Sequence, residues 1–442
     1  MSVLRIRNAD VLQCESDSAR ILAARDIDVD GNRITAVGPS GSEEPPTGAE
    51  IIDAGGMLAV PGFVNTHAHV PMTIFRGLAE DVDIETWFNE YMWPLEANLT
   101  ADDVFWGMKL GLAEMIASGV TAVADHYFQM DRVAAAVGEA GTRAALGWAV
   151  FGDQGDEGVR RTASFAEEFS GAAGGRITTW LAPHAPYTCD AAFLEAVAAE
   201  SDRLGLGIHI HAAETPGQTE ASLAAIGRTP IQVLAETGVL DRPTILAHCC
   251  GATPDDIDLM AEKPCGVAHA PKTYLKLGMG AAPVLELRRA GVPVGLATDG
   301  PVSNNTLDIL ESMRLMAMVV KHETGDPRRM TVGEVLTVAT RESARVFGLP
   351  DDLGHLAPGF LADIVLVDLG GAHNQPPHDS AANLVYSVRA SDVRTVICDG
   401  KILMRDRVLL TLDLEEIKAR VGESMTRLSQ RVPDSRIQLY RP

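Results

Sequence analysis

The sequence predicts an α/β protein, in which a (β/α)8 (TIM) barrel is joined to a small β-sandwich domain built from both chain ends. Two observations lead to this prediction. In the middle of the chain, short apolar runs alternate with helical stretches, which is typical of a parallel sheet. At both ends, strand-like segments are separated by tight turns instead, and we expect these two parts to pair with each other.

The barrel is predicted from eight strand candidates, spread over about 290 residues. They are 57–65, 120–127, 143–151, 177–184, 207–211, 244–249, 266–270 and 293–299. Periodic apolar residues predict helices between several of them, for example over 101–118 and 191–204. Most of the strand candidates end at or beside a polar residue. Because the carboxyl ends of barrel strands carry the active site, these polar residues are candidates for chemistry.

The predicted domain boundaries follow from the turns and the change of pattern. Asp30-Gly31 and Asp399-Gly400 each lie between alternating apolar residues, which indicates one hairpin near each end of the chain. We expect the β-sandwich domain to comprise 1–58 and 355–412, and the barrel to comprise 59–354. The remaining 413–442 would form a C-terminal helix and tail. Apolar residues three or four apart over 413–432 predict an amphipathic helix, packed on the barrel or on a second copy in a homo-oligomer.

Composition restricts the partners. The chain has 442 residues, 46% of them apolar, which excludes a disordered or fibrous protein. Its 37 basic and 60 acidic residues give a net charge of −23, which disfavours nucleic acid and anionic membranes as partners. No stretch of 18 apolar residues is present. Six cysteines without C-x-x-C spacing and an N-terminus unlike a signal peptide predict a cytoplasmic location.

A pair of histidines ends the first strand candidate. His67 and His69 are two residues apart, so their imidazoles face the same side of a strand. The fifth strand candidate holds a second such pair, His209 and His211, and Glu214 follows in the loop. One histidine of the second pair would complete a set of three nitrogen donors. Taken singly, each pair is more often structural than catalytic.

Two more strand ends extend the pattern. The sixth strand candidate ends at His248, and the eighth ends at Asp299. Three imidazoles and a carboxylate form a mixed N/O site suited to Zn²⁺, with Fe²⁺ or Mn²⁺ also compatible. A site that keeps one position for water indicates catalysis, because the cation lowers the pKa of that water. His248, Asp299 and Glu214 would then carry protons around the nucleophile.

This succession of motifs resembles the amidohydrolase superfamily over nearly the whole chain. The motifs are His67-x-His69, His211-x-x-Glu214, His248-Cys249 and Thr298-Asp299-Gly300. More narrowly, they are similar to those of the mononuclear-metal aminohydrolases, which include deaminases of adenosine derivatives and of guanine, and triazine hydrolases. The resemblance implies a hydrolase of carbon–nitrogen bonds other than peptide bonds, in which a cyclic amidine loses ammonia.

The resemblance also implies a role for each motif residue. His67, His69, His211 and Asp299 would hold one divalent metal ion, Zn²⁺ being expected. Glu214 would protonate the ring nitrogen beside the attacked carbon. His248 and Asp299 would orient and deprotonate the water and pass a proton to the leaving amine. Binuclear relatives carry a carboxylated lysine at the end of the fourth strand, where this sequence has 180–184 without a lysine, so one metal ion is expected.

Three further histidines are left without an assigned role. His209 would support a metal ligand or line the barrel. His269, at the end of the seventh strand candidate, would orient Asp299 or belong to the core. For His126, at the end of the second strand candidate, a place in the pocket and a place in the core are equally compatible with the pattern.

The resemblance implies an adenosine derivative as the small heterocyclic substrate, such as 5′-methylthioadenosine or S-adenosylhomocysteine. Trp87 would contact the apolar thioether end, and Glu96 would accept hydrogen bonds from the ribose hydroxyls, as a carboxylate does from a vicinal diol. His184 would contact the purine. Arg160 matches one of two arginines that bind the amino-acid carboxylate of S-adenosylhomocysteine. Without the resemblance, Trp87 would be assigned to a helix core, and Glu96 and Arg160 to the surface.

The sequence departs from the family pattern at two positions. Trp148 stands where the second arginine is expected, and Tyr274 stands where a small amide is usual. We therefore expect Trp148 to line the substrate site and S-adenosylhomocysteine to be disfavoured, since its carboxylate would lose one of two cations. The alternatives are a guanine or pterin deaminase or a triazine amino- or chlorohydrolase, and, further away, a cyclic amide hydrolase. A barrel that only binds its ligand is the non-enzymatic alternative.

Overall fold

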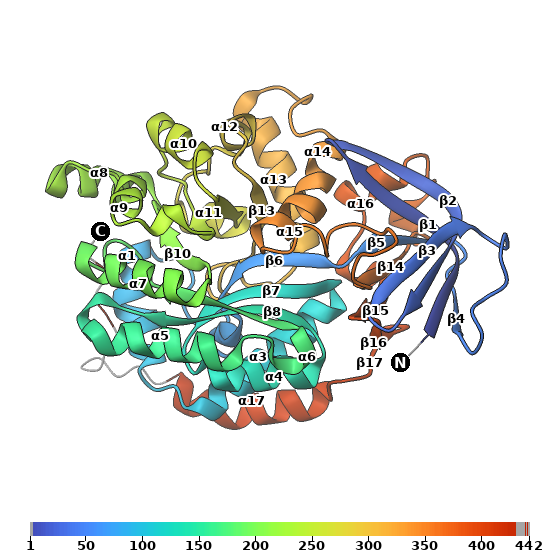
Figure 1. Ribbon diagram of the computed structural model, residues 1–442, viewed down its shortest axis with the longest axis horizontal. Coiled ribbons are helices and arrows are strands. Elements are labelled where there is room, and N and C mark those ends of the chain that lie inside the picture. Colours follow the sequence, from blue (N-terminus) through green and yellow to red (C-terminus); the bar gives the residue numbers. More distant parts are fainter. Residues whose placement is uncertain (1–2, 430–437, 439, 441–442) are drawn as a thin grey trace.

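The computed structural model describes residues 3–429, 438 and 440, and it contains an eight-stranded parallel barrel (Figure 1). Neighbouring strands in the barrel follow one another in the sequence. The strands are β6 (Phe63–Ala68), β7 (Val120–Tyr127), β8 (Arg143–Val150), β9 (Ile177–Pro183), β10 (Ile208–Ala212), β11 (Thr244–His248), β12 (Cys265–His269) and β13 (Val294–Leu296). The predicted (β/α)8 barrel is confirmed.

The barrel closes where β13 meets β6. The backbone N–H of Asp299 donates to the carbonyl of His67 (3.0 Å), and the Thr66 hydroxyl donates to the carbonyl of Leu296 (2.9 Å). Gly295 allows this approach, because a Cβ there would lie 2.5 Å from the Thr66 methyl carbon. The seam therefore places the last strand end directly beside the first.

Helices cover the outside of the barrel (Figure 1). The longer ones are α3 (Ala101–Ala117), α4 (Met130–Ala140), α5 (Gly155–Phe169), α7 (Ala191–Leu204), α8 (Pro216–Ile226), α10 (Pro254–Ala261) and α13 (Ile309–Thr324). Thr100 and Asp103 start α3 with a capping box, in which each side chain accepts a hydrogen bond from the backbone N–H of the other. The barrel strands are buried on both faces, which accounts for their apolar runs.

A second sheet of nine strands is built from both ends of the chain, as predicted (Figure 1). Its strands are β1 (Val3–Glu15), β2 (Ser18–Asp30), β3 (Arg33–Pro39), β4 (Glu50–Asp53), β5 (Met57–Pro61), β14 (Ile364–Asp368), β15 (Val393–Cys398), β16 (Lys401–Arg405) and β17 (Val408–Leu409). It is a mixed sheet, in which β14 lies between β5 and β15. Both predicted hairpins are present, β2–β3 and β15–β16.

The run 57–65 is divided between the two sheets. Its first part is β5, which pairs antiparallel with β14, and its second part begins β6 of the barrel. The division falls at Gly62, whose N–H donates to the carbonyl of Asp363 (2.8 Å). A Cβ at Gly62 would lie 2.2 Å from the Thr121 hydroxyl oxygen, so glycine is needed where the chain passes from one sheet to the other.

The predicted C-terminal helix is α17 (Leu414–Leu428), which packs against α3 (Figure 1). Ile417 and Leu428 are buried, and Arg427 forms an ion pair with Asp103 (2.6 Å). The end of the expected range, 430–432, lies outside the described residues. Within the described part of the chain, no helix is both long and apolar enough to cross a membrane.

Candidate active site

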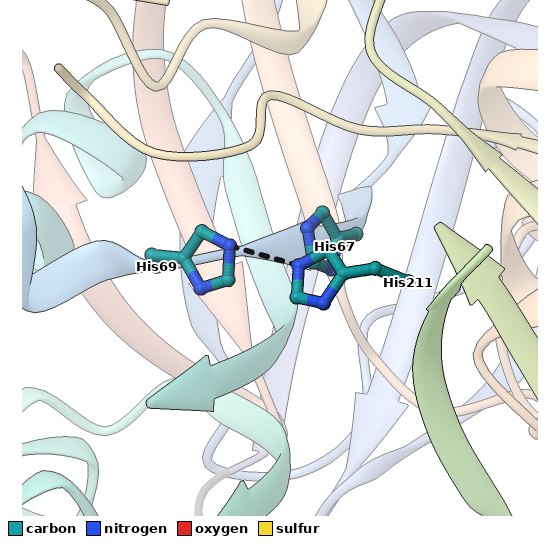
Figure 2. Close-up of side chains that lie close together, drawn as sticks. All are labelled: His67, His69 and His211. Carbon is teal, nitrogen blue, oxygen red and sulfur yellow. Dashed lines mark hydrogen bonds between the residues drawn. The ribbon is translucent and has the colours of Figure 1, made fainter. Parts of the chain in front are cut away.

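Three imidazoles converge at the carboxyl ends of β6 and β10 (Figure 2). The Nε2 atoms of His69 and His211 are 3.2 Å apart. His67 lies beside both, and its Nε2 atom is buried without a hydrogen-bond partner. Because buried polar atoms in proteins are normally paired, the unpaired Nε2 atom of His67 is suited to binding a cation between the three rings.

The other nitrogen of each ring is held by the protein. The Nδ1 atom of His69 is 2.5 Å from the carbonyl oxygen of His126, and that of His211 is 2.8 Å from the carbonyl oxygen of His184. The Nδ1 atom of His67 is 2.8 Å from Nε2 of His209. An imidazole that donates its Nδ1–H to such a partner presents the lone pair of Nε2, which is the form that binds a cation.

Asp299 supplies the carboxylate of the cluster. Its Oδ1 atom lies 3.5 Å from Nε2 of His67 and 3.3 Å from Nε2 of His69. Burial alone would raise the pKa of Asp299, but the adjoining imidazoles of His67 and His69 hold that pKa well below its usual value. The carboxylate is therefore ionised, and three imidazoles with one carboxylate fit a Zn²⁺-type divalent cation. His67, His248 and Asp299 form an overlapping group with ligand atoms equally close.

Backbone strain marks two of these strand ends. His248 and Asp299 have positive φ angles of 80° and 60°, which lie in the left-handed region that non-glycine residues rarely adopt. Each such residue costs about 1–3 kcal/mol. The bond from Asp299 N–H to the carbonyl of His67 holds one of them in place. The strain turns both side chains toward the centre of the barrel mouth.

Glu214 and His248 stand next to the cluster. Burial raises the pKa of Glu214 to about 7, so this carboxyl group can carry a proton at neutral pH. Burial lowers the pKa of His248 to about 3, so its ring is neutral at neutral pH. The rings of His248 and His211 are stacked, with centroids 5.5 Å apart. The site thus combines a carboxyl group that can carry a proton, Glu214, with an ionised carboxylate, Asp299, and a neutral imidazole, His248.

A pocket opens above this cluster. Its apolar lining consists of Met72, Ile84, Trp87, Phe88, Met92, Trp93, Phe128, Ala149, Phe151, Leu277 and Met279. Its polar lining consists of His69, Glu96, His126, Tyr127, His184, His211, Glu214, His248, Asp299 and Ser303. Among the described residues that line it, none is a lysine or an arginine. The pocket therefore suits a flat, largely uncharged ring system.

Comparison with known proteins identifies the family. Residues 58–403 match the model of the Amidohydrolase family. This chain belongs to the amidohydrolase family. It is 46% identical over 402 residues to a 5-methylthioadenosine/S-adenosylhomocysteine deaminase of Moorella thermoacetica, covering 90% of this chain and 94% of that one.

Two solved structures resemble this amidohydrolase closely. An adenosine deaminase from Xanthomonas campestris with bound zinc superposes with a TM-score of 0.92 at 31% identity, covering 96% of this chain and 98% of that one. An atrazine chlorohydrolase from Arthrobacter aurescens in complex with zinc gives a TM-score of 0.85 at 26% identity, covering 97% and 100%. The fold and the recognised family are therefore confirmed.

The pocket of this amidohydrolase is lined by three of the residues for which the family resemblance implies substrate contact. Trp87 lies in the π-helical segment η2 (Trp87–Met92), and Glu96 ends α2 (Trp93–Glu96). Burial raises the pKa of Glu96 to about 7, and the Tyr127 hydroxyl donates to its Oε1 atom (2.7 Å). His184 follows β9, and its Nδ1 atom is 3.0 Å from the Thr188 hydroxyl.

Two other residues assigned to the substrate lie elsewhere in the amidohydrolase. Trp148 packs edge-on against Phe165 of α5, with ring centroids 5.7 Å apart, and it is not among the residues that line the pocket. Its neighbour Ala149 lines the pocket, because successive side chains of a strand face opposite sides. Arg160 is exposed on α5. Contact of Trp148 or Arg160 with a substrate stays a prediction.

The remaining histidines and Tyr274 have identifiable contacts. His209 contacts His67, as described, and so supports the cluster. His126 lines the pocket. His269 packs against the ring of Tyr274 with centroids 5.3 Å apart, while the Tyr274 hydroxyl accepts a hydrogen bond from the Ala270 N–H (2.9 Å). Tyr274 is thereby buried beside the site.

Three contacts of the site involve residues outside the sequence motifs. The Ser303 hydroxyl donates to Oδ2 of Asp299 (2.7 Å), a role for which His269 was considered. Tyr127 bonds to Glu96, and Gln218 accepts the backbone N–H of Glu214 (3.0 Å). Ser303 follows Asp299 by four residues and Gln218 follows Glu214 by four, so closeness in sequence to a motif residue is the signal that could have identified both.

Proposed function

We propose that this amidohydrolase is a metal-dependent deaminase that hydrolyses an adenosine derivative such as 5′-methylthioadenosine or S-adenosylhomocysteine. The observation that carries the proposal is the convergence of three Nε2 atoms and an ionised carboxylate below a pocket that also holds Glu214 and His248. The names of the relatives support it, since the Moorella protein is a deaminase of these two compounds.

One divalent cation would be held by His67, His69, His211 and Asp299. Zn²⁺ is proposed, because the donors are nitrogen and oxygen and two similar structures contain zinc, while Fe²⁺ and Mn²⁺ use similar donors. When bound, the cation supplies Lewis acidity that makes a water molecule nucleophilic near neutral pH. The protein's own contribution is to orient the donors and to move protons.

The proton transfers are assigned to three side chains. Glu214, in its protonated form, donates its proton to the ring nitrogen beside the carbon that bears the amine. Asp299 and His248 accept the two protons of the attacking water; one passes to the leaving amine, and the other replaces the proton that Glu214 gave up. The C–N bond breaks, ammonia leaves, and the ring carbon keeps the water oxygen as a carbonyl. The sum is hydrolysis, with no change of oxidation state.

Substrate binding is assigned to the pocket walls. Glu96 would accept hydrogen bonds from the two ribose hydroxyls through its ionised carboxylate. Trp87 would pack against the apolar 5′ substituent, and His184 would contact the purine. Since no cationic side chain lines the pocket within the described residues, a 5′ substituent without charge fits it best.

A second candidate keeps the cation and changes the ring. Triazine hydrolases superpose with this chain at a TM-score of 0.86, so loss of amine or halide from a triazine is the nearest alternative, together with guanine and pterin deamination. Glu96 in the pocket favours a ribose-bearing substrate over these bare rings. Hydrolysis of cyclic amides is disfavoured, because β9 has no lysine at its carboxyl end.

One experiment tests the proposal. Ammonia release is measured with adenosine, 5′-methylthioadenosine, S-adenosylhomocysteine, guanine, a pterin and a triazine, and the metal content of the same sample is determined. Release from the adenosines at kcat/KM values well above those of the other rings supports the proposal. Release from a bare ring alone would replace it with the second candidate.

We further infer a cytoplasmic protein that does not bind nucleic acid. All six cysteines are unpaired and buried, as in a reducing compartment, and the net charge is −23. Fractionation of cells that produce the protein tests the location.

A further inference from the structure

A tyrosine far from the barrel in the sequence is buried beside the pocket. Tyr440 is 4% exposed, and its backbone pairs with the side-chain amide of Asn89 in η2. The Tyr440 N–H donates to Oδ1 of Asn89 (2.8 Å), and the Tyr440 carbonyl accepts from Nδ2 (3.3 Å). The Tyr440 ring stacks on Phe88, with centroids 5.2 Å apart and planes 9° from parallel. Phe88 itself lines the pocket.

The same tyrosine contacts the first turn of α8, the helix that follows β10. Its hydroxyl accepts a hydrogen bond from Nε2 of Gln218 (3.3 Å), and Oε1 of Gln218 accepts the backbone N–H of Glu214 (3.0 Å). Gln218 is buried as well. The Tyr440 ring also packs edge-on against Tyr187, with centroids 5.3 Å apart. Tyr440 thus connects the wall formed by η2 with the loop that carries the proposed acid.

We propose that Tyr440 is a positioning residue of the active site, whose ring holds η2 and its pocket-lining residues Trp87 and Phe88 in place for the substrate. The proposal rests on the proposed function where it predicts kinetics. The anchoring of η2 by Tyr440 does not depend on any activity. A wall anchored by two hydrogen bonds and an aromatic stack loses little entropy when a ligand packs against it, and so binds more tightly.

The kinetic test compares Tyr440→Ala with Tyr440→Phe. Loss of the ring should raise KM for the adenosine substrate by about 3- to 10-fold, the size of an aromatic pair interaction, with kcat within about 2-fold of wild type. Tyr440→Phe keeps the stack and should restore KM. The matched control is Tyr386→Ala, at a half-exposed tyrosine in α16 (Ser380–Tyr386), which should change neither constant. In a Phe88→Ala background, Tyr440→Ala should have little further effect on KM, because the stacking partner of Tyr440 is already absent.

The structural test is hydrogen–deuterium exchange on the full chain. The amides of 87–92 should exchange faster in Tyr440→Ala than in wild type or Tyr386→Ala. Unchanged exchange there would overturn the proposal, and so would a KM that stays at the wild-type value while only the active fraction falls. Faster exchange in a protein that deaminates none of the adenosines would keep the positioning role and reject the proposed function.

Discussion

The lining of the pocket predicts discrimination between two substrates that differ in charge. S-adenosylhomocysteine carries an amino-acid carboxylate, whereas 5′-methylthioadenosine ends in a methyl group. Lys276, the cation beside the pocket residue Leu277, is already bound to Glu80 (2.8 Å) and to the carbonyl of Val302 (2.8 Å). Arg160 is exposed on α5. A carboxylate entering the pocket would therefore lose water without gaining a cation.

The size of the preference follows from the lack of a cation to pair with the carboxylate of S-adenosylhomocysteine. A hydrogen bond to a charged group contributes about 1.5–3 kcal/mol, so 5′-methylthioadenosine should be preferred by about 10- to 100-fold in kcat/KM. Leu277→Arg, at a half-buried position of the pocket rim, should narrow the ratio by supplying the cation. Leu275→Arg adds the same charge to the same helix, α11 (Pro271–Leu277), at an exposed position and serves as the control.

The assay is ammonia release at subsaturating concentrations of each substrate, with the three proteins at equal metal content. Equal kcat/KM values for both substrates in the wild type would refute the reasoning. A further outcome is that Leu277→Arg and Leu275→Arg change the ratio of the two kcat/KM values equally. That result would show that the added charge acts at long range and that the pocket does not discriminate between the two 5′ substituents.

Four further predictions concern the site itself. Chelation should abolish activity, and one equivalent of Zn²⁺ per chain should restore it, as measured by metal analysis and ammonia release. Glu214→Gln should keep the metal and lower kcat by about 10²- to 10⁴-fold, the contribution of a positioned acid. Ser303→Ala removes a hydrogen bond to the Asp299 carboxylate and should lower kcat by about 10-fold. Because burial raises the pKa of Glu96 to about 7, this carboxyl is mostly protonated at pH 6 and ionised at pH 8, so KM for a nucleoside should fall as the pH rises. Glu96→Gln should remove that dependence.

Each of these predictions has a contradicting outcome. Two tightly bound metal ions per active chain would exclude the mononuclear site. Loss of the metal in Glu214→Gln would make Glu214 a ligand, and full activity would make it a bystander. If Ser303→Ala has the kcat of the wild type, the Ser303 hydroxyl is not needed to position Asp299, and the backbone alone does so. A KM that rises from pH 6 to pH 8 would mean that the protonated form of Glu96 binds the substrate.

Much of the site could be predicted because strand ends are local features. His67 and His69 share a strand face by their spacing, and the apolar run before them identifies the strand. The same rule could not separate His209 from His211, because both side chains face the barrel interior. Depth along the strand decides between them: His211 reaches the cluster, whereas His209 contacts the back of His67.

Other features depend on contacts that no local pattern records. The family spacing predicts substrate contact for Trp148, but it carries no information on the packing of Trp148 against Phe165 of α5 or on Ala149 lining the pocket. Tyr440 reaches its partner Asn89 across 351 residues of sequence. The division of 57–65 at Gly62 depends on the pairing of β5 with β14, which lies some 300 residues later in the sequence.

That late pairing has a consequence for how the protein is made. Pro61 at the end of β5 pairs with Ile364 in β14, and 303 residues separate the two. At the usual 5–20 residues per second, about 15–60 s of synthesis pass before β14 leaves the ribosome. Throughout that time β5 presents an open edge, which is the kind of strand to which other chains can add. We expect nascent chains that end between the two strands to depend on chaperones, and the completed chain to be released from them.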